Sequence, residues 1–297
     1  MTLDAAPIAA ATPSALLLPS GKIDLLVLSH SDSDHVGDTV DILRGNDVAM
    51  IVHPGDPRGG TLNAIRAAIR SEPGARVIDL SRDTFLVGET LALGTASVTL
   101  IAGWKDGHDT EGPGEPRLRD GPLNNALSIV VKFTYAGRSV LLTGDTVGRV
   151  DGTTNTACQY AERIMVERAD RVPIQSQVLV GQHHGGDNAT SNCFIRAVKP
   201  EWVVFSAGHA NRHPRQSTAD QLVAWGVDPD QILRTDRGDF EKTVKKGAVE
   251  WLYKTPRDCP PDPPSDDDVE IRLLSDPAVA ISVAYRLPSE ACKATPG

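Results

Sequence analysis

The sequence predicts an α/β domain in which helices cover a layered β-sheet. Short β-rich apolar segments alternate along the chain with segments of helical periodicity, and runs rich in Gly, Pro and Asp separate them. A chain of 297 residues can bury a large core in one or two domains. Its composition, 40% hydrophobic and 23% charged, is that of an ordinary globular protein.

The first half of the chain contains four predicted strands and two predicted helices. We predict the strands at residues 23–28, 48–53, 75–80 and 96–104. Gly37 and the segment after it predict a helix that ends near Gly45. Residues 61–72 are amphipathic, with apolar side chains at helical spacing. Residues 105–121 are polar and rich in Gly, Pro and Asp, which predicts a long loop and a potential lid over a site.

The second half continues the alternation. Residues 128–145 predict a β-hairpin that turns at Ala136 and Gly137. Strands follow at 176–182 and 201–207, and helices at 155–170, 189–200 and 217–227. Residues 256–268 form a linker rich in Pro and Asp, and strands are predicted beyond it at 269–274 and 280–287. We therefore expect an irregular lead over residues 1–22, a main domain over 23–255, and a linker with C-terminal strands over 256–297.

Charge and hydropathy restrict the possible partners. A net charge of −9 and a pI of about 5.4 do not support binding to an extended nucleic-acid duplex, which requires a basic face. The chain has no run of 18 apolar residues, so it predicts no membrane segment. The N-terminus carries Asp4 and lacks the basic region of a signal peptide, which predicts a cytoplasmic location.

The four cysteines are Cys158, Cys193, Cys259 and Cys292. No two of them form a CxxC pair, which argues against a zinc ribbon. Their even number permits disulfides, and their spacing leaves the choice between disulfides and free thiols open.

The stretch "HSDSDH", residues 30–35, directly follows the predicted strand at 23–28. Loops that leave strand ends often carry binding or catalytic residues. Imidazole and carboxylate groups suit zinc, manganese or iron, and the stretch has no thiolate that would favour a softer metal. The alternative is a solvated turn in which Asp32 or Ser33 caps a helix. Four ligand-type residues among six favour a metal site.

Further ligand-type residues directly follow other predicted strands. They are Asp145, His183, His184, His209, Asn211 and His213. Each has an ordinary explanation by itself, as a helix cap or part of a Gly-rich turn. Because strand ends can meet at one rim of a sheet, their repetition at these positions predicts that they converge.

Four segments together carry a family resemblance: "SHSDSDHVG", "LLTGDT", "HHGG" and "SAGHANRHP". They resemble the metallo-β-lactamase-fold hydrolases. Among these, they look most like the ComEC-type branch, the hydrolase domain attached to bacterial DNA-uptake channels, and its free-standing relatives. The superfamily motif is His-x-His-x-Asp-His, and Asp32 stands at its second His here, as in the ComEC-type branch. The resemblance spans roughly residues 23–238.

The resemblance implies an αββα sandwich with a two-metal site at one edge. Family members usually begin with a hairpin that carries a D-x-G-Q-G-D type motif. Residues 1–22 contain no such motif. We therefore expect the first N-terminal strands to be missing, which would leave an exposed edge beside residues 23–28.

The resemblance also implies the metal ligands, which are His30, Asp32, Asp34, His35, Asp145, His183 and His184. The first two would bind one ion and the next two the other, while Asp145 would bridge both ions. One histidine of the 183–184 pair would complete the second site, with His183 as the first choice and His184 close behind. The third-motif histidine of the superfamily has no clear counterpart, because His108 lies in the predicted loop. Asn125 is expected to face the first ion instead.

Two ions held close together activate water and polarise the bond under attack. We expect Asp34 to orient that water, His213 to protonate the leaving oxygen or stabilise its charge, and Asn211 to help position His213. Zinc or manganese would serve, and the carboxylate-rich ligand set tilts the choice towards manganese. The expected function is metal-dependent hydrolysis of a phosphodiester. The alternatives are hydrolysis of a lactone, a β-lactam or another small-molecule ester or amide, and a catalytically impaired relative that only binds.

Overall fold

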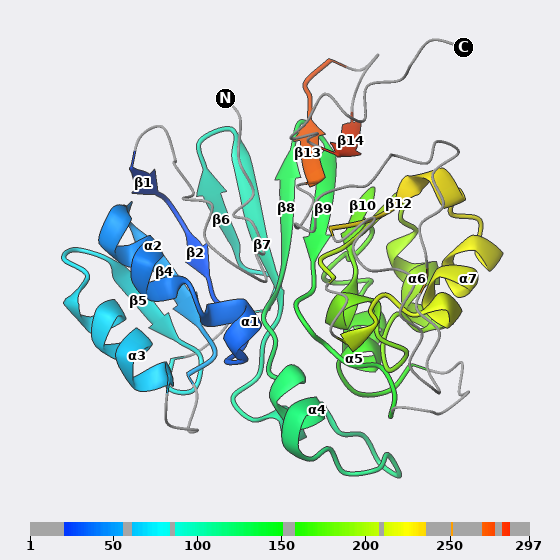
Figure 1. The fold of residues 1–297 in the computed structure, drawn as a ribbon, viewed down its shortest axis with the longest axis horizontal. Coiled ribbons are helices and arrows are strands. Elements are labelled where there is room, and N and C mark those ends of the chain that lie inside the picture. The colour runs from blue at the N-terminus through cyan, green and yellow to red at the C-terminus, as the bar shows by residue number, and fades with distance from the viewer. Residues whose placement is uncertain are drawn as a thin grey trace.

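The structure is a computed structural model that describes residues 21–55, 61–83, 87–150, 158–207, 211–235, 251, 269–276 and 281–285. Its elements form four layers, in the order helix, sheet, sheet, helix (Figure 1). This arrangement confirms the predicted αββα fold class. Among the described residues, no helix combines the length and the apolar character that crossing a membrane requires.

The first sheet contains three parallel strands in the order β2-β4-β5. Its strands are β2 (Leu26–Val27), β4 (Met50–His53) and β5 (Arg76–Asp79), and a separate parallel pair joins β1 (Lys22–Ile23) to β3 (Asp47–Val48). The helices α2 (Thr39–Gly45) and α3 (Thr61–Ser71) cover its outer face (Figure 1). They pack through Leu43, Ile65 and Ile69 against strand residues such as Leu26 and Ile51.

The second sheet contains seven strands in the order β12-β11-β10-β9-β8-β7-β6. In chain order these are β6 (Thr90–Leu93), β7 (Ala96–Ala102), β8 (Val130–Tyr135), β9 (Arg138–Leu142), β10 (Val178–Val180), β11 (Trp202–Phe205) and β12 (Ile232–Arg234). The first four are antiparallel, whereas β9 to β12 run parallel. The predicted hairpin is confirmed: Ala136 and Gly137 join β8 to β9 with positive φ angles of 49° and 75°, as a tight hairpin turn requires.

Three apolar clusters hold the layers together. The helices α5 (Tyr160–Glu167), α6 (Asn192–Val198) and α7 (Gln216–Ala224) pack on the outer face of the seven-stranded sheet, for example through Phe194 and Leu222. Between the two sheets, Val52 and Leu80 meet Val98 and Ile129. The C-terminal pair β13 (Val269–Leu273) and β14 (Ile281–Tyr285) packs on β9 to β12 through a further cluster that includes Val283. A disulfide joins Cys158 to Cys193, with a Cα–Cα distance of 5.8 Å.

The structure corrects several sequence predictions. The segment 23–28 is two short strands, because β1 pairs with β3 while β2 pairs with β4. Sequence reasoning did not find β6, β12 or α4 (Asp120–Asn125). The predicted loop over 105–121 contains a 3₁₀ turn at Gly107–Thr110. This loop is anchored rather than free, since Arg163 Nε donates to Glu115 Oε1 at 3.0 Å and the Tyr160 hydroxyl donates to the Pro116 carbonyl at 2.7 Å.

Other predictions concern residues outside the described part. These are the missing N-terminal strands, the linker at 256–268, Cys259 and Cys292. The strand β2 does lie at the edge of its three-stranded sheet within the described residues. The domain boundary at residue 256 stays a prediction.

Candidate metal centre

The direction of the strands places the candidate site residues at one edge of the seven-stranded sheet. Because β9, β10 and β11 are parallel, the residues that follow them lie at the same edge of the seven-stranded sheet. The loop after β2 reaches this edge from the other sheet, where Ile129 N donates to Ser29 O at 2.9 Å. The helices α1 (Ser33–Val36) and α4 lie at this edge (Figure 1).

The loop after β2 holds four of the predicted ligands. His30 is fully buried, and α1 is a single turn whose Val36 is buried and anchors it in the core. The His35 side chain is also buried, whereas the carboxyl groups of Asp32 and Asp34 are close to half exposed. Thus the imidazoles form the floor of the site and the carboxylates form its open side.

Asp145 follows β9 and reaches the same point because Gly144 permits a close approach between the two sheets. Gly144 has a φ of +52°, and a Cβ atom there would lie 2.9 Å from the Ser29 Cβ. Asp145 is buried, with 4% of its surface exposed, and its backbone N–H donates to Ser128 Oγ at 3.0 Å. A side chain at position 144 would therefore push Asp145 away from the loop after β2.

In the turn after β10, Gln182–Gly185, the adjacent residues His183 and His184 direct their rings towards different partners. His183 and His184 both have left-handed backbones, with φ angles of 44° and 53°, a conformation that costs roughly 1–2 kcal/mol per non-glycine residue. His183 Nδ1 lies 2.6 Å from Asn188 Oδ1, and its Nε2 lies 3.2 Å from the Asn125 amide. His184 Nδ1 instead contacts the Ser206 carbonyl, which directs its Nε2 towards Asp34 and Asp145.

Donor atoms of Asp34, His35 and His184 all lie within 4.8 Å of one another, and Asp145 contacts both of these histidines. We call these four residues the Asp34 group. His184 Nε2 lies 3.2 Å from both Asp34 Oδ2 and His35 Nε2, and 3.4 Å from Asp145 Oδ2. His35 Nε2 lies 3.2 Å from Asp145 Oδ1 and 3.8 Å from Asp34 Oδ2. A tetrahedral ion with ligand distances of about 2.0–2.2 Å separates its donor atoms by about 3.3–3.6 Å. The trio of Asp34, His35 and His184 therefore suits a divalent metal ion, with the Asp145 carboxylate beside it.

A second set of donors, His30, Asp32 and Asp145, lies on the other side of the shared carboxylate, and we call it the His30 group. His30 Nε2 lies 3.5 Å from Asp32 Oδ2 and 3.7 Å from Asp145 Oδ2. This nitrogen is buried, and no hydrogen-bond partner reaches it. A buried polar atom without a partner is unfavourable, and a metal ion beside Asp32 and Asp145 would supply the missing interaction.

The charges of the Asp34 group are strongly coupled. Burial lowers the pKa of His184, but the carboxylates of Asp145 and Asp34 outweigh burial and raise this pKa to about 11. The hydrogen bond with His184 lowers the pKa of Asp34 to about 2. Burial raises the pKa of Asp145, yet His184 and His35 hold it well below its usual range. Without an ion, a proton on His184 thus offsets the negative charge that would bind a cation.

Small polar side chains that sequence reasoning missed support both groups. Ser29 Oγ lies 3.2 Å from Nδ1 of both His30 and His35, and Ser128 Oγ lies 3.2 Å from His30 Nδ1. Such contacts fix the orientation of the ring whose other nitrogen faces the ion. Ser29 stands next to the "HSDSDH" stretch, but nothing in the sequence marks Ser128 or Gly144.

Two adjacent asparagines on α4 hold the Asp32 carboxylate. Asn124 donates its amide hydrogen to Asp32 Oδ1 and accepts from the Ser31 hydroxyl at 2.8 Å. With its amide oxygen facing His183 Nε2, Asn125 donates to Asp32 Oδ2 at 3.2 Å. Asn125 thus lies beside the His30 group, and its predicted position facing the first ion stays a prediction.

The remaining histidines differ in their positions. His213 is buried, and its ring centroid lies 5.4 Å from that of His183 and 6.2 Å from that of His184. His108 lies 2.6 Å from Glu111 Oε1 within the anchored loop, in neither ligand group. Asn211 is exposed, and its side chain makes no hydrogen bond to the described residues of the centre. His209 lies outside the described residues.

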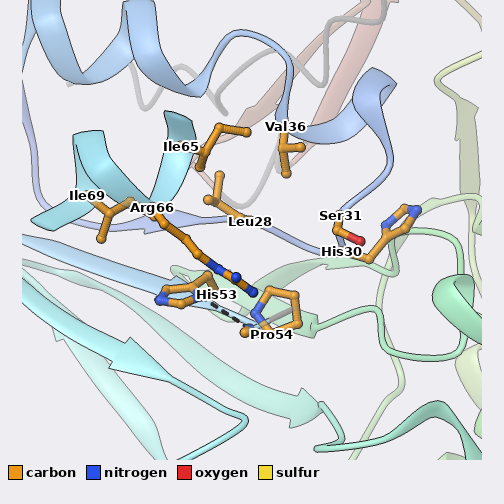
Figure 2. Close-up of a pocket in the computed structure, with 10 residues that line it drawn as sticks. Leu28, His30, Ser31, Val36, His53, Pro54, Ile65, Arg66 and Ile69 are labelled. Carbon is orange, nitrogen blue, oxygen red and sulfur yellow. Dashed lines mark hydrogen bonds between the residues drawn. The ribbon is translucent and has the colours of Figure 1, made fainter. Parts of the chain in front are cut away.

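A pocket lies beside the centre, between α3 and the loop after β2. Its wall is mainly apolar and includes Leu28, Val36 and Ile65, and it ends at His30 and Ser31. The His30 ring points away from the other side chains that line it (Figure 2). The pocket therefore lies behind this ring and not in front of the ligand atoms.

The chain is similar to two competence proteins and to several solved structures. The chain is 31% identical over 137 residues to Competence protein ComA of Neisseria gonorrhoeae, covering 45% of this chain and 18% of that protein. It is 24% identical over 239 residues to ComE operon protein 3 of Bacillus subtilis (strain 168), covering 78% and 25% respectively. The chain thus spans a quarter or less of these relatives. Among solved structures, CmlA, a diiron β-hydroxylase from Streptomyces venezuelae, is 16% identical with a TM-score of 0.43, covering 72% of this chain and 44% of CmlA.

The resemblance to the ComEC-type branch is confirmed by these two relatives. The family model of the metallo-β-lactamase superfamily matches residues 1–209, which is more than half of the chain. Together with the αββα layers and the ligand-type side chains at one edge, this match assigns the family. The chain belongs to the metallo-β-lactamase superfamily.

Proposed function

We propose that the chain is a metal-dependent hydrolase with a two-ion centre, acting on a phosphodiester. The observation that carries this proposal is the position of Asp145. Its Oδ2 faces His30 Nε2 at 3.7 Å and His184 Nε2 at 3.4 Å, while its Oδ1 faces His35 Nε2 at 3.2 Å. A buried carboxylate between two sets of donors is suited to bridging two cations.

In this proposal, the ligand of the second ion is His184 rather than His183. Both ring nitrogens of His183 already contact the amides of Asn188 and Asn125. The Asp34 group, with two imidazoles and two carboxylates, suits zinc. The His30 group has one imidazole and two carboxylates, which is a harder ligand set and favours manganese.

Two divalent ions held by these residues would supply a water that ionises near neutral pH and an electrophile for the bond under attack. The carboxylate of Asp34 is ionised at neutral pH and about 43% exposed. It is therefore free to accept a hydrogen bond from the attacking water and to orient it. This role agrees with its place on the open side of the centre.

His213 is suited to stabilising charge as a neutral hydrogen-bond donor. Burial, together with the charges of His183 and Arg215, lowers the pKa of His213 to about 3. An imidazole that is neutral at pH 7 still carries one N–H, which can donate to a developing negative charge. We assign His213 this role in place of proton donation by an imidazolium. Asn211, which is exposed, has no role in the proposal.

The phosphodiester substrate is supported by similarity to the ComEC-type branch, which is attached to DNA-uptake channels. The charge of the centre agrees with an anionic substrate only once ions are bound, because the side chains alone are acidic. The disulfide between Cys158 and Cys193 favours a non-reducing compartment over the cytoplasm predicted from the N-terminus. Alkylation of thiols in intact cells, followed by mass spectrometry, tests this compartment.

The function is tested by metal analysis and substrate comparison on one preparation. We expect up to two divalent ions per chain and hydrolysis of bis-p-nitrophenyl phosphate, with little turnover of a lactone or a chromogenic β-lactam. The matched variants are Asp145→Asn, which removes one charge from the centre, and Asp41→Asn, which removes one from the exposed face of α2. Loss of ions and activity in the first variant alone supports the proposal. Preferred hydrolysis of the lactone or β-lactam would replace it.

A further inference from the structure

Arg215 follows the His213–Pro214 pair and precedes α7 directly. Its guanidinium group is unusual within the described residues. The Nε and Nη1 atoms are both buried, and neither has a hydrogen-bond partner. Two other arginines of this acidic chain illustrate the usual pairing with a carboxylate: Arg163 Nε lies 3.0 Å from Glu115 Oε1, and Arg44 Nη1 lies 3.3 Å from Asp41 Oδ1.

Arg215 packs against the turn that carries the histidine pair. Its backbone N–H donates to the Gly185 carbonyl at 2.9 Å. A Cβ atom on Gly185 would lie 2.4 Å from the Pro214 Cβ, so the two segments are in direct contact. Since His213 lies beside His183 and His184, the backbone of Arg215 lies on the His184 side of the centre.

A guanidinium with two buried donors that lack an acceptor is energetically unfavourable, because burial removes water from these donors without supplying a partner. Such violations of the usual rules are expected at functional sites. The planar guanidinium has a rigid fork of donors that matches the oxygens of a phosphate group. The unsatisfied Nε and Nη1 atoms belong to the two different forks of this group, so each can donate a hydrogen bond to a phosphate oxygen, with Nη2 as the second donor of either fork.

We propose that Arg215 binds a second phosphate group of the substrate, adjacent to the phosphodiester that is hydrolysed. This inference rests on the proposed function and narrows it. The substrate class becomes a phosphodiester with a neighbouring phosphate. That phosphate is either a terminal monoester or the next diester of an oligonucleotide.

The first experiment measures kcat/KM on matched dinucleotides. The substrates are thymidylyl-thymidine without a terminal phosphate, the same dinucleotide with a 5′- or a 3′-phosphate, and the trinucleotide with an internal second diester. A hydrogen-bonded charge pair corresponds to about 10- to 100-fold in kcat/KM. We expect the wild type to prefer one of the substrates with a second phosphate by this factor. Which substrate is preferred identifies the source of the phosphate.

Arg215→Ala should reduce that preference to about one, whereas Arg215→Lys should keep part of it, because lysine retains the charge without the fork. The control Arg44→Ala removes the same charge from an exposed pair on α2 and should leave the preference unchanged. A wild-type ratio near one, or a ratio that Arg215→Ala leaves intact, would overturn the proposal.

The second experiment needs no turnover. Binding of thymidine 5′-monophosphate and of inorganic phosphate to the metal-loaded protein is measured by calorimetry, for the wild type, Arg215→Ala and Arg215→Lys. We expect Arg215→Ala to bind these ligands at least about 10-fold more weakly than the wild type, and Arg215→Lys to have an affinity between the two. Equal affinity in all three proteins overturns the proposal even if the diesters are hydrolysed.

Arg215-dependent binding without hydrolysis of any diester would instead reject the proposed function and leave the phosphate site standing. Thermal unfolding separates a ligand site from a structural role. Removing an unpaired buried charge should not lower Tm in the absence of ligand. If both Arg215→Ala and Arg215→Lys unfold at a clearly lower temperature, Arg215 is a structural residue and the proposal fails.

Discussion

The Asp34 group and the His30 group share Asp145 but differ in how their donor atoms are arranged. The Asp34 group has four donors with five separations between 3.2 and 3.8 Å. The His30 group has three donors at 3.5 and 3.7 Å, and two asparagine amides also hold Asp32. The first group thus offers three mutually close donors with Asp145 beside them, whereas the second has a single imidazole and leaves room for water or substrate.

The largest effect is expected from removing the shared carboxylate. Asp145→Ala should lose at least one ion and reduce hydrolysis to background, because both groups lose a ligand. Metal analysis and turnover on the same preparation measure both quantities. Unchanged metal content in this variant would show that Asp145 is not a ligand.

Each group also has a ligand that the other group lacks, so the two ions can be tested independently. His184→Ala should lower the affinity of the Asp34 group for its ion by more than 100-fold, and His30→Ala should do the same for the His30 group. The expected loss is this large because even residues that only support a ligand contribute 10- to 100-fold to metal affinity. The control His183→Ala should keep the ion of the Asp34 group. Metal titration by calorimetry distinguishes these cases, and the reverse result for His183 and His184 would exchange their roles.

His213 should affect turnover without affecting either ion. His213→Ala is expected to lower kcat by roughly 10²–10⁴-fold with unchanged metal content, the usual size for removal of a positioned donor. Because the pKa of His213 is about 3, this loss should not vary between pH 5 and 8. Lower metal content in the variant would make His213 a ligand, and an unchanged kcat would end its catalytic role.

A smaller effect is expected from the amide that holds Asp32. Asn124→Ala removes the hydrogen bond to Asp32. It should lower the affinity of the His30 group for its ion by about 10- to 100-fold and leave the affinity of the Asp34 group unchanged. Asn188→Ala, which removes the partner of His183 instead, is the matched comparison. Equal loss at both ions in Asn124→Ala would contradict the separation of the two groups.

The proton on His184 gives the smallest measurable difference. In the metal-free protein its pKa is raised to about 11 from an ordinary value near 6.5. Its contribution to stability is therefore complete below pH 6.5 and is lost as pH rises through about 11. Ion binding at pH 8 should release about one proton from His184. Calorimetry in buffers of different ionisation enthalpy measures this number, and binding without proton release would contradict the assignment.

The alternation of strands and helices predicted an α/β layered domain, and the family resemblance implied the αββα order of its layers. The residues that follow β2, β9 and β10 were found because ligand-type side chains after apolar strands are visible in the chain. Sequence reasoning preferred His183 to His184, and the geometry of the centre favours His184 in our proposal. The choice depends on the left-handed turn at Gln182–Gly185 and on the Ser206 carbonyl, and neither can be read from neighbouring residues.

The supporting contacts were missed for a related reason. Ser128, Asn124 and Gly144 matter because two sheets approach each other closely at Ser29, and this distance comes from packing between segments that lie far apart in the sequence. The short strands β6 and β12 were missed because pairing with neighbouring strands, rather than their own pattern, defines them. The disulfide could not be predicted from the sequence, because the pairing of Cys158 with Cys193 depends on how α5 and α6 lie relative to each other.

The central claim is that Asp145 joins two ion-binding groups. Crystals of the protein loaded with manganese and zinc, measured by anomalous diffraction at the absorption edge of each metal, test it most directly. We predict two peaks on either side of the Asp145 carboxylate, one among Asp34, His35 and His184 and the other beside His30 and Asp32. A single peak in contact with His183, or no peak in contact with Asp145, would contradict the claim.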